Sequence, residues 1–505
     1  MTQPLDNLRS LAYFGPELAL SGAILLVILW DLVVKQARVA GALAIAFAAL
    51  AVSAGLSVQA IVSGAGSRGL FNGLIAFDGY TSLFRILIAF VTAMVLVFSK
   101  PSLEEKSARE PGEFITLLLV LTLGMNLMAA SRNLLMIYLS LEMVSVISFV
   151  LAGFKLDDAK SSEAALKYVV FGGVASGIML YGMSFLFGVS QSLNLSDIAA
   201  KTAELTAQQG KVPGAVFVGV VCMMAGFGYK ISAAPFHMWT PDVYEGAPTA
   251  VTAFLSVGPK AAGFAVMMRF FSEALGAVHD ARIAGTVVDA APWAILIGCL
   301  AMATMTIGNL SALGQDNVKR MLAYSSIAHA GYMLLGFSGM SKVGVASIAF
   351  YVITYCFMNL GAFLVVMAVA EQNGGDETVG AFRGLGRRAP VLAIVMAVFL
   401  FSLTGLPPMA GFVGKFYLFS ALLETGGTWS WTVAVVGVLN SVISLFYYAR
   451  VLRVMFLEDA VATEPTTVRP MFQVTSLALA VPTLVLGVYW SPVYDFVVRS
   501  LATVR

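Results

Sequence analysis

Residues 228–237 read GYKISAAPFH and lie inside an apolar segment long enough to span a membrane. Lys230 places a charge at bilayer depth, where an ionisable side chain is costly and usually functional. Pro235 has no backbone N–H to donate to the carbonyl of Ile231, four residues earlier. Membranes tolerate such a break only where protein packs around it or a wet cavity lies beside it. The stretch therefore predicts a broken membrane helix with a titratable lysine at the break.

The composition of the whole chain indicates an integral membrane protein. Of its 505 residues, 59% are hydrophobic and 11% are charged, too few polar residues to cover a soluble globule of this size. The net charge of +2 indicates no nucleic-acid partner. Cys222, Cys299 and Cys356 lie far apart within apolar segments, so we expect neither a disulfide framework nor a metal site.

The apolar segments predict an all-α fold of about fourteen transmembrane helices in one membrane domain, residues 1–505. With about 20 apolar residues per span, the predicted spans are 13–33, 38–62, 76–98, 113–130, 132–153, 165–188, 213–245, 248–272, 292–311, 320–340, 344–370, 390–424, 431–457 and 471–496. The seventh and twelfth are longer than a bilayer core of about 30 Å requires. Pro235 lies in the seventh and Pro407 and Pro408 lie in the twelfth, so we expect both helices to be broken.

The two broken spans lie five spans apart, which predicts two five-helix units with the break in the fourth helix of each. Because five is odd, the second unit enters the membrane from the opposite side, as an inverted repeat. The expected divisions are helices 1–3 in 1–110, the first repeat (helices 4–8) in 111–275, the second repeat (helices 9–13) in 290–460 and helix 14 in 468–505. A ten-residue spacing from Arg132 to Glu142 recurs from Lys319 to His329, although chance can also produce this match.

Loop charges predict the orientation of the chain. The loops after odd-numbered helices carry more lysine and arginine than the termini and the remaining loops together. Positive charge favours the cytoplasmic side of a membrane. We therefore expect both termini on the outer side.

Four ionisable side chains lie deep within the predicted spans: Glu142, Lys230, Lys260 and Lys415. At about 2.5–3.5 kcal/mol each, they cost roughly 10–14 kcal/mol together, comparable with the whole stability of a small domain. Pro259 precedes Lys260 and is expected to break the eighth helix in the same way as Pro235 breaks the seventh. Glu142 is the natural counter-charge for Lys230. Its approach or withdrawal would decide whether that lysine keeps its proton.

Two further residues have an open interpretation. His329 either relays protons between Lys260 and Lys415, because imidazole titrates near neutrality, or is a hydrogen-bonded core histidine. Lys167 is either a relay residue or a lysine whose ammonium extends to the membrane surface. The alternative for all the buried charges is a set of static ion pairs that fix helix packing. Lys260 and Lys415 have no evident partner, and an unpartnered buried charge packs helices poorly.

Other features are expected to be structural. Asp78 and Arg85 lie seven residues apart on one helical face and are expected to pair. Residues 64–69 match G-x-G-x-x-G, but no predicted strand precedes them, so we expect a flexible connector instead of a phosphate-binding loop. His237, in the second half of the broken seventh helix, is ambiguous. The chain has no Walker motif and no cysteines spaced to bind a metal ion.

Two long motifs carry a family resemblance: GYKISAAPFHMWTPDVYEGAPT at 228–249 and KRMLAYSSIAH at 319–329. They resemble the antiporter-like membrane subunits of respiratory complex I, most closely the subunit N type of bacterial NADH-quinone oxidoreductase, over essentially the whole chain. This resemblance implies proton translocation across the bacterial inner membrane, driven by quinone reduction elsewhere in the complex. Matched motif by motif, the family's functional residues fall on Glu142, Lys167, Lys230, Lys260 and Lys415.

The same resemblance implies cofactors and partners. The chain would be a translocase subunit of an NADH:quinone oxidoreductase with no redox centre of its own. NADH, FMN, iron–sulfur clusters and quinone would be bound by other subunits, and the partners would be other membrane-arm subunits, including neighbouring antiporter-like subunits, and lipids. Two alternatives remain: a subunit of a multisubunit sodium/proton antiporter, and a structural spacer of the membrane arm.

Overall fold

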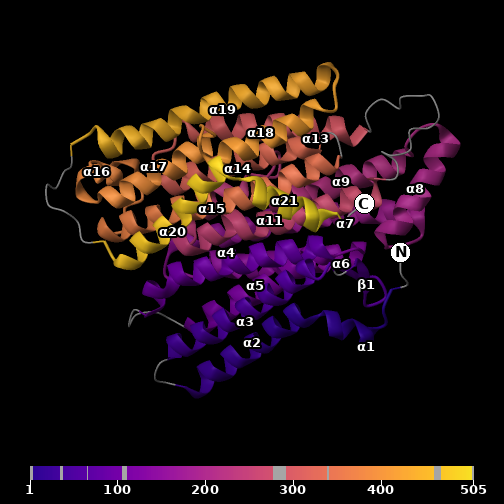
Figure 1. Ribbon diagram of the computed structural model, residues 1–505, viewed down its shortest axis with the longest axis horizontal. Coiled ribbons are helices and arrows are strands. Elements are labelled where there is room, and N and C mark those ends of the chain that lie inside the picture. Colours follow the sequence, from indigo (N-terminus) through magenta and orange to yellow (C-terminus); the bar gives the residue numbers. More distant parts are fainter. Residues whose placement is uncertain are drawn as a thin grey trace.

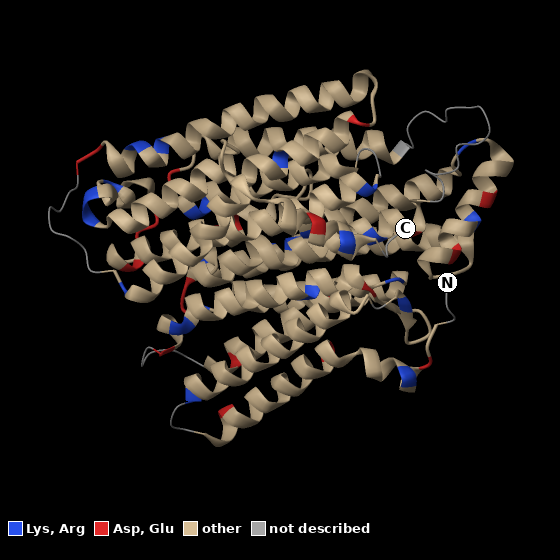
Figure 2. Ribbon diagram, viewed as in Figure 1, with Lys and Arg blue, Asp and Glu red and all other residues tan. Residues whose placement is uncertain are grey.

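The computed structural model describes residues 4–34, 38–64, 66–104, 111–276, 292–337, 341–459 and 468–502. Long helices lie side by side along the molecule (Figure 1). Twelve of the described helices are long and apolar enough to cross a membrane. Most of the charged residues lie near the two ends of the bundle (Figure 2), where a membrane protein meets water. The predicted multi-span membrane fold is therefore confirmed.

The N-terminal part contains three long helices and one hairpin. Its elements are α1 (Asn7–Ser10), η1 (Leu11–Tyr13), α2 (Gly15–Val33), α3 (Arg38–Val62), β1 (Arg68–Leu70), β2 (Ile75–Phe77) and α4 (Gly79–Glu104). The two strands pair antiparallel, with Leu70 opposite Ile75. The expectation of a flexible connector is wrong from residue 68 onward, because Leu70 and Ile75 bury their side chains against Ala130 and so stabilise the hairpin.

The next helices form the first predicted repeat. They are α5 (Pro111–Ala130), α6 (Leu134–Ala152), α7 (Ala159–Ser190), α8 (Leu195–Gln209), α9 (Gly214–Ile231), α10 (Trp239–Gly246) and α11 (Thr249–Ala274). The break between α9 and α10 contains Pro235, as predicted. The break predicted at Pro259 is wrong, because α11 continues through this proline. Neighbouring helices cover α11 on all sides, and such packing lets a membrane helix tolerate proline.

The second predicted repeat and the C-terminal helices complete the bundle. They are α13 (Pro292–Ala312), α14 (Val318–Leu334), η2 (Leu335–Phe337), α15 (Lys342–Gln372), η3 (Val379–Phe382), α16 (Leu385–Arg388), α17 (Pro390–Thr404), α18 (Ala410–Leu423), α19 (Gly427–Phe456), α20 (Pro470–Val488) and α21 (Ser491–Leu501). The break between α17 and α18 contains Pro407 and Pro408, as predicted. The single helix expected at 471–496 is wrong beyond Val488, because Tyr489 leaves the helical conformation and α21 begins at Ser491, with Pro492 in its first turn.

The two runs of helices share local structure where the second helix of each unit begins. Asn133 caps α6 and Asn317 caps α14, each through its side chain. Each asparagine also pairs with the segment after the third helix of its unit, Asn133 with Asn194 and Asn317 with Thr378. This correspondence agrees with the predicted two-repeat organisation.

The same correspondence corrects the ten-residue spacing match. Glu142 lies nine residues after Asn133, and the residue nine after Asn317 is Ser326. His329 lies twelve residues after Asn317, and the residue twelve after Asn133 is Ser145. Glu142 and His329 are therefore not equivalent, and the recurrence of the spacing is a coincidence.

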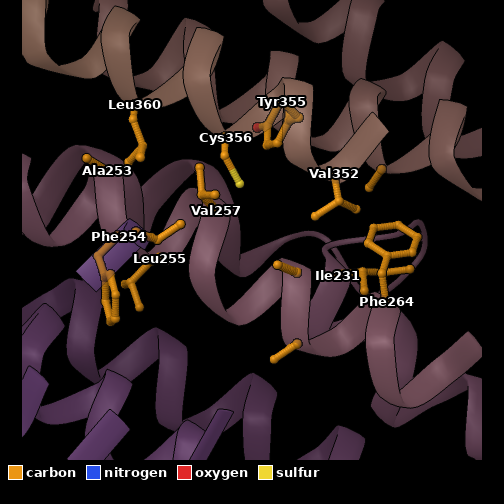
Figure 3. Packing of buried hydrophobic residues seen from close by; sticks show 14 of the residues in the cluster. Ile231, Ala253, Phe254, Leu255, Val257, Phe264, Val352, Tyr355, Cys356 and Leu360 are labelled. Atoms are coloured by element: carbon orange, nitrogen blue, oxygen red, sulfur yellow. The ribbon is translucent and has the colours of Figure 1, made fainter. Parts of the chain in front are cut away.

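The centre of the molecule is the contact between α11 and α15. The whole apolar stretch of α11 is buried, together with most of α15. Leu360 and Cys356 of α15 point toward Ala253 and Val257 of α11 (Figure 3). A helix that is apolar on all sides is stable only when it is surrounded by other helices or lipid. This packing puts Lys260, on α11, at the centre of the bundle.

Candidate functional site

Lys230 lies where the seventh span breaks. It is the second-last residue of α9 and is 2% exposed. Ser232 follows with a positive φ of 63° and ends the helix. The Lys230 Nζ donates to Ser145 Oγ on α6 over 2.8 Å. The C-terminus of a helix favours a positive charge because its carbonyls point outward there, so the break suits an ammonium group.

Glu142 lies on α6, close to one turn before Ser145, and is half-buried. Its Oε1 is buried without a hydrogen-bond partner. Among the described residues, no ion pair within 4 Å joins Glu142 to Lys230, since the ammonium bonds Ser145 instead. Glu142 and Lys230 thus lie on neighbouring helices, α6 and α9, without forming the expected ion pair. One carboxylate oxygen of Glu142 remains without a hydrogen bond.

Lys260 lies in the middle of α11 and is 2% exposed. Its Nζ donates to the backbone carbonyl of Ser326 over 3.0 Å and to the hydroxyl of the same residue over 2.5 Å. Tyr355 also donates to that hydroxyl, over 2.8 Å. The ring of Tyr244 lies 5.9 Å from the ammonium. These neighbours are neutral dipoles and an aromatic ring, which solvate a charge without forming a fixed ion pair.

His329 lies on α14 in a group of tyrosines. Its Nδ1 is 2.7 Å from Tyr351 Oη, and its Nε2 is 3.4 Å from Tyr448 Oη. The rings of Tyr355 and Tyr332 lie 5.3 and 5.8 Å from the imidazole ring. The histidine is therefore hydrogen-bonded in the core, and it is also next to the tyrosine that bonds the same serine as Lys260.

Lys415 lies on α18 and extends back across the second break. Its Nζ donates to the carbonyls of Leu403 and Thr404, at the end of α17, over 3.2 and 2.9 Å. It also donates to Ser441 Oγ over 3.2 Å. Lys230 lies in the first half of its broken helix, α9, and Lys415 lies in the second half of its own, α18. Both ammonium groups nevertheless lie at the C-terminal end of the first half, α9 or α17. The carbonyls left free by the break bind the second charge directly.

A series of polar side chains continues from Lys415 toward His329. Ser441 donates to Tyr332 Oη over 3.2 Å, and the Tyr332 ring lies 4.3 Å from the Lys415 Nζ. On the other side, α11 packs directly on Lys230, because a Cβ at Gly263 would be 3.1 Å from Lys230 Cγ. Gly263 is about one turn from Lys260. No hydrogen bond between described residues bridges this interval.

Sequence reasoning did not find the serine and tyrosine side chains that surround the buried lysines and His329. These are Ser145, Tyr244, Ser326, Tyr332, Tyr351, Tyr355, Ser441 and Tyr448. A usable signal was present, because Tyr351 and Tyr355 lie four residues apart on one face of a mostly apolar helix. Ser325 and Ser326 likewise lie beside His329 in the quoted motif.

Lys167 is not part of this buried group. It lies on α7, is 38% exposed, and pairs with Asp242 at 2.6 Å and Glu163 at 2.7 Å. Arg320 of α14 pairs with Asp242 and Glu245 of α10 at 2.6 and 3.0 Å. Lys167 therefore belongs to a half-exposed ionic cluster that joins α7, α10 and α14. His237 lies in the break before α10, buried, and its Nδ1 has no hydrogen-bond partner.

The pair expected between Asp78 and Arg85 is not formed. Asp78 instead binds Arg269 of α11, with Nη1 to Oδ2 at 3.0 Å and Nη2 to Oδ1 at 3.1 Å. Arg269 also bonds Glu273 over 2.8 Å. Arg85 donates to Glu17 of α2 over 2.7 Å. The expectation is wrong because each residue has an oppositely charged partner on an adjacent helix, and that partner is closer than the residue seven positions away along the chain.

Among the described residues, no group of three or more histidine, cysteine, aspartate or glutamate side chains is arranged to hold a metal ion. The three cysteines are free thiols.

Comparison with known proteins shows which family has this sequence. A family model described as NADH:quinone oxidoreductase/Mrp antiporter, TM, matches residues 131–444, which include both broken helices and all the buried lysines described above. The chain belongs to this antiporter family. Within the family, the chain is 67% identical to NADH-quinone oxidoreductase subunit N 2 of Sorangium cellulosum, with 99% of each chain covered. It is 46% identical to subunit N of an Anaeromyxobacter species, covering 99% of this chain and 98% of the relative.

Two solved structures contain chains with the same fold. A chain of respiratory complex I from Thermus thermophilus matches with a TM-score of 0.77 and 29% identity, covering 95% of this chain and 98% of that one. A chain of the Mrp complex from a Dietzia species matches with a TM-score of 0.80 at 20% identity, over 97% of both chains, and shows the fold alone. The resemblance to subunit N of complex I, predicted from the two motifs, is confirmed by the high-identity relatives.

Proposed function

We propose that this chain is a proton-translocating membrane subunit of a bacterial NADH-quinone oxidoreductase. The observation that carries the proposal is the series of hydroxyl and imidazole groups between two buried amines. Lys260 bonds Ser326, which Tyr355 bonds in turn, and Tyr355 packs against His329. From the far end, Lys415 bonds Ser441, whose partner Tyr332 also lies beside His329.

The proposed mechanism starts at Glu142 and Lys230. When the carboxylate approaches, it stabilises the charged lysine. When it withdraws, the ammonium keeps only the Ser145 hydroxyl and gives its proton up toward Lys260. His329 passes the proton onward between Lys260 and Lys415, since both its ring nitrogens face hydroxyl groups. Lys415 then exchanges it with the outside.

The buried ion-pair alternative explains these lysines less well. In the part of the chain that the structure describes, the Lys260 and Lys415 ammonium groups bond hydroxyl and carbonyl oxygens and no carboxylate. Static packing charges are stable in a membrane when they are paired. Groups that must alternate between charged and neutral forms need neighbours that tolerate both.

Further parts of the proposal concern the placement of the chain in a complex. We propose, from the excess of loop lysine and arginine, that α14 begins on the cytoplasmic side and that both termini lie in the periplasm. The chain itself would carry no redox centre, and NADH, FMN, iron–sulfur clusters and quinone would be bound by other subunits. Lys167, in the ionic cluster on the proposed cytoplasmic side, would supply protons at the surface. The division into 1–110, 111–275, 290–460 and 468–505 is part of the same proposal.

Replacing Lys230 with alanine tests the proposal. We expect Lys230→Ala to lower the pumping rate about tenfold or more, because losing a positioned proton-transfer group typically costs about 10²–10⁴-fold. Proton uptake by vesicles that contain the assembled complex measures the rate, and NADH:quinone electron transfer is recorded in parallel. Lys342→Ala, at an exposed lysine where α15 begins, is the matched control and should pump normally.

Two outcomes would contradict the proposal in different ways. Normal pumping by an assembled Lys230→Ala complex would remove that lysine from the pathway. Purification of the chain without flavin and iron–sulfur proteins, together with sodium-driven proton exchange, would favour the antiporter alternative. If variants at every buried lysine assemble and pump normally, the structural-spacer alternative is favoured.

A further inference from the structure

A second buried ion pair lies in the N-terminal helices, outside the two predicted repeats. Glu17 of α2 and Arg85 of α4 are both 0% exposed. One hydrogen bond joins them, from Arg85 Nε to Glu17 Oε1 over 2.7 Å. Glu17 Oε2 and both Arg85 Nη atoms have no hydrogen-bond partner in the protein. An ion pair in the membrane interior is stable only when its remaining donors and acceptors are also bonded.

The side chain of Asn126, on α5, is at the same depth as Glu17. It is 1% exposed, and neither atom of its amide has a partner in the protein. Asp31 of α2 lies against Gly112 of α5, where an added Cβ would be 2.2 Å from Asp31 Cγ. The two helices run antiparallel, and Glu17 and Asn126 each lie 14 residues from that contact, about 21 Å at 1.5 Å per residue.

The depth of Arg85 relative to Asn126 follows from a second contact. Thr92 of α4 and Thr122 of α5 bond each other over 2.7 Å. Arg85 lies seven residues before Thr92, and Asn126 lies four residues after Thr122, which leaves an axial offset of about 4.5 Å between antiparallel helices. An arginine side chain spans this offset. Ser82, one turn before Arg85, also has an unbonded buried hydroxyl.

The unbonded atoms define the chemistry of a ligand. Arg85 offers N–H donors, Glu17 Oε2 is an acceptor, and the Asn126 amide is both. An anion would satisfy the guanidinium but meet the free carboxylate oxygen, and a cation would have the opposite conflict. Water donates and accepts, and buried waters in proteins typically make about three hydrogen bonds to groups of this kind. We propose that α2, α4 and α5 enclose a binding site for a small cluster of water molecules that bridges Glu17, Arg85 and Asn126.

Replacing Asn126 with leucine tests this site through the sign of a stability change. If water bridges the amide to the ion pair, Asn126→Leu displaces it and lowers the thermal unfolding temperature of the assembled complex. If no water is bound, the variant removes an unbonded buried amide and raises that temperature, because such a group is itself destabilising. Thr122→Val, on the same face of α5, is the control. This variant breaks the hydrogen bond between Thr92 and Thr122, which involves no proposed water, and so measures the stability lost with one direct hydrogen bond between α4 and α5.

A density map of the assembled wild-type complex gives a second, independent measurement. At a resolution where other buried waters are visible, we expect peaks within hydrogen-bond distance of Glu17 Oε2, the Arg85 Nη atoms and the Asn126 amide. Their absence from the wild-type map, or a raised unfolding temperature for Asn126→Leu, would overturn the proposal. Persistence of the peaks in the Asn126→Leu map would limit the site to Glu17 and Arg85 and overturn the bridging role of Asn126.

Discussion

Replacing Lys260 with methionine is expected to abolish most proton pumping while the complex still assembles. Lys260 lies on the fully buried helix α11, and Ser326 and Tyr355 connect it to His329. Methionine has a similar length but no proton to give or accept. The pumping rate should fall about 10²-fold or more, the usual scale for a lost acid–base group.

Assembly should survive this substitution for an electrostatic reason. Removing one member of a buried ion pair leaves an uncompensated charge, which is strongly destabilising. Among the described residues, the Lys260 ammonium bonds only oxygens of Ser326, so Lys260→Met leaves no charge unpaired. The Ser326 hydroxyl also keeps its bond from Tyr355. A stable but inactive variant would thus separate a proton-transfer role from a packing role.

The measurement compares proton uptake and electron transfer in vesicles that contain the assembled complex. Lys201→Met is the matched control, because Lys201 on α8 is half-exposed and pairs with Glu204 on its own helix. It should behave like the unmodified complex. Pumping by Lys260→Met at more than about half the normal rate would show that protons do not need this residue. Loss of assembly would support the structural spacer.

Replacing Arg269 with methionine is expected to have the largest effect on stability. Arg269 is 0% exposed and bonds both oxygens of Asp78, Glu273 and the backbone carbonyl of Ala129. The variant leaves the Asp78 carboxylate buried without its counter-charge, which typically costs about 3–5 kcal/mol. Because Asp78 lies at the start of α4 and Arg269 on α11, the N-terminal helices should detach from the first repeat.

Thermal unfolding and the yield of assembled complex measure this effect. Arg383→Met is the control, since Arg383 pairs with Glu458 at 3.0 Å with about half of its side chain exposed. Exposed pairs are typically worth about 0.2–1 kcal/mol, so this variant should change stability little. The double variant Asp78→Asn with Arg269→Met should recover part of the loss, because it removes the unpaired charge. Equal effects of Arg269→Met and Arg383→Met would show that the buried pair contributes nothing special.

The sequence predicted the fold well because the bilayer restricts what a chain can form. A chain in hydrocarbon must bond its backbone internally, so each long apolar segment had to be a helix. Pro235, Pro407 and Pro408 marked the two real breaks, since those segments were longer than one span. Pro259 did not break its helix, because proline in a fully packed helix is held by its neighbours. The hairpin at residues 68–77 was missed because its strands are only three residues long.

The sequence alone placed Glu142, Lys230, Lys260 and Lys415 in segments that had to enter the membrane, but it did not single out Glu17 and Arg269, which are also buried. Only the tertiary structure decided what each charge bonds. The Lys230 ammonium donates to Ser145, Arg269 pairs with Asp78, and Lys167 lies in a half-exposed ionic cluster. Apolar periodicity and length set the burial of a segment one helix at a time. A hydrogen-bond partner depends on which faces of different helices meet, and these contacts join residues up to 191 positions apart.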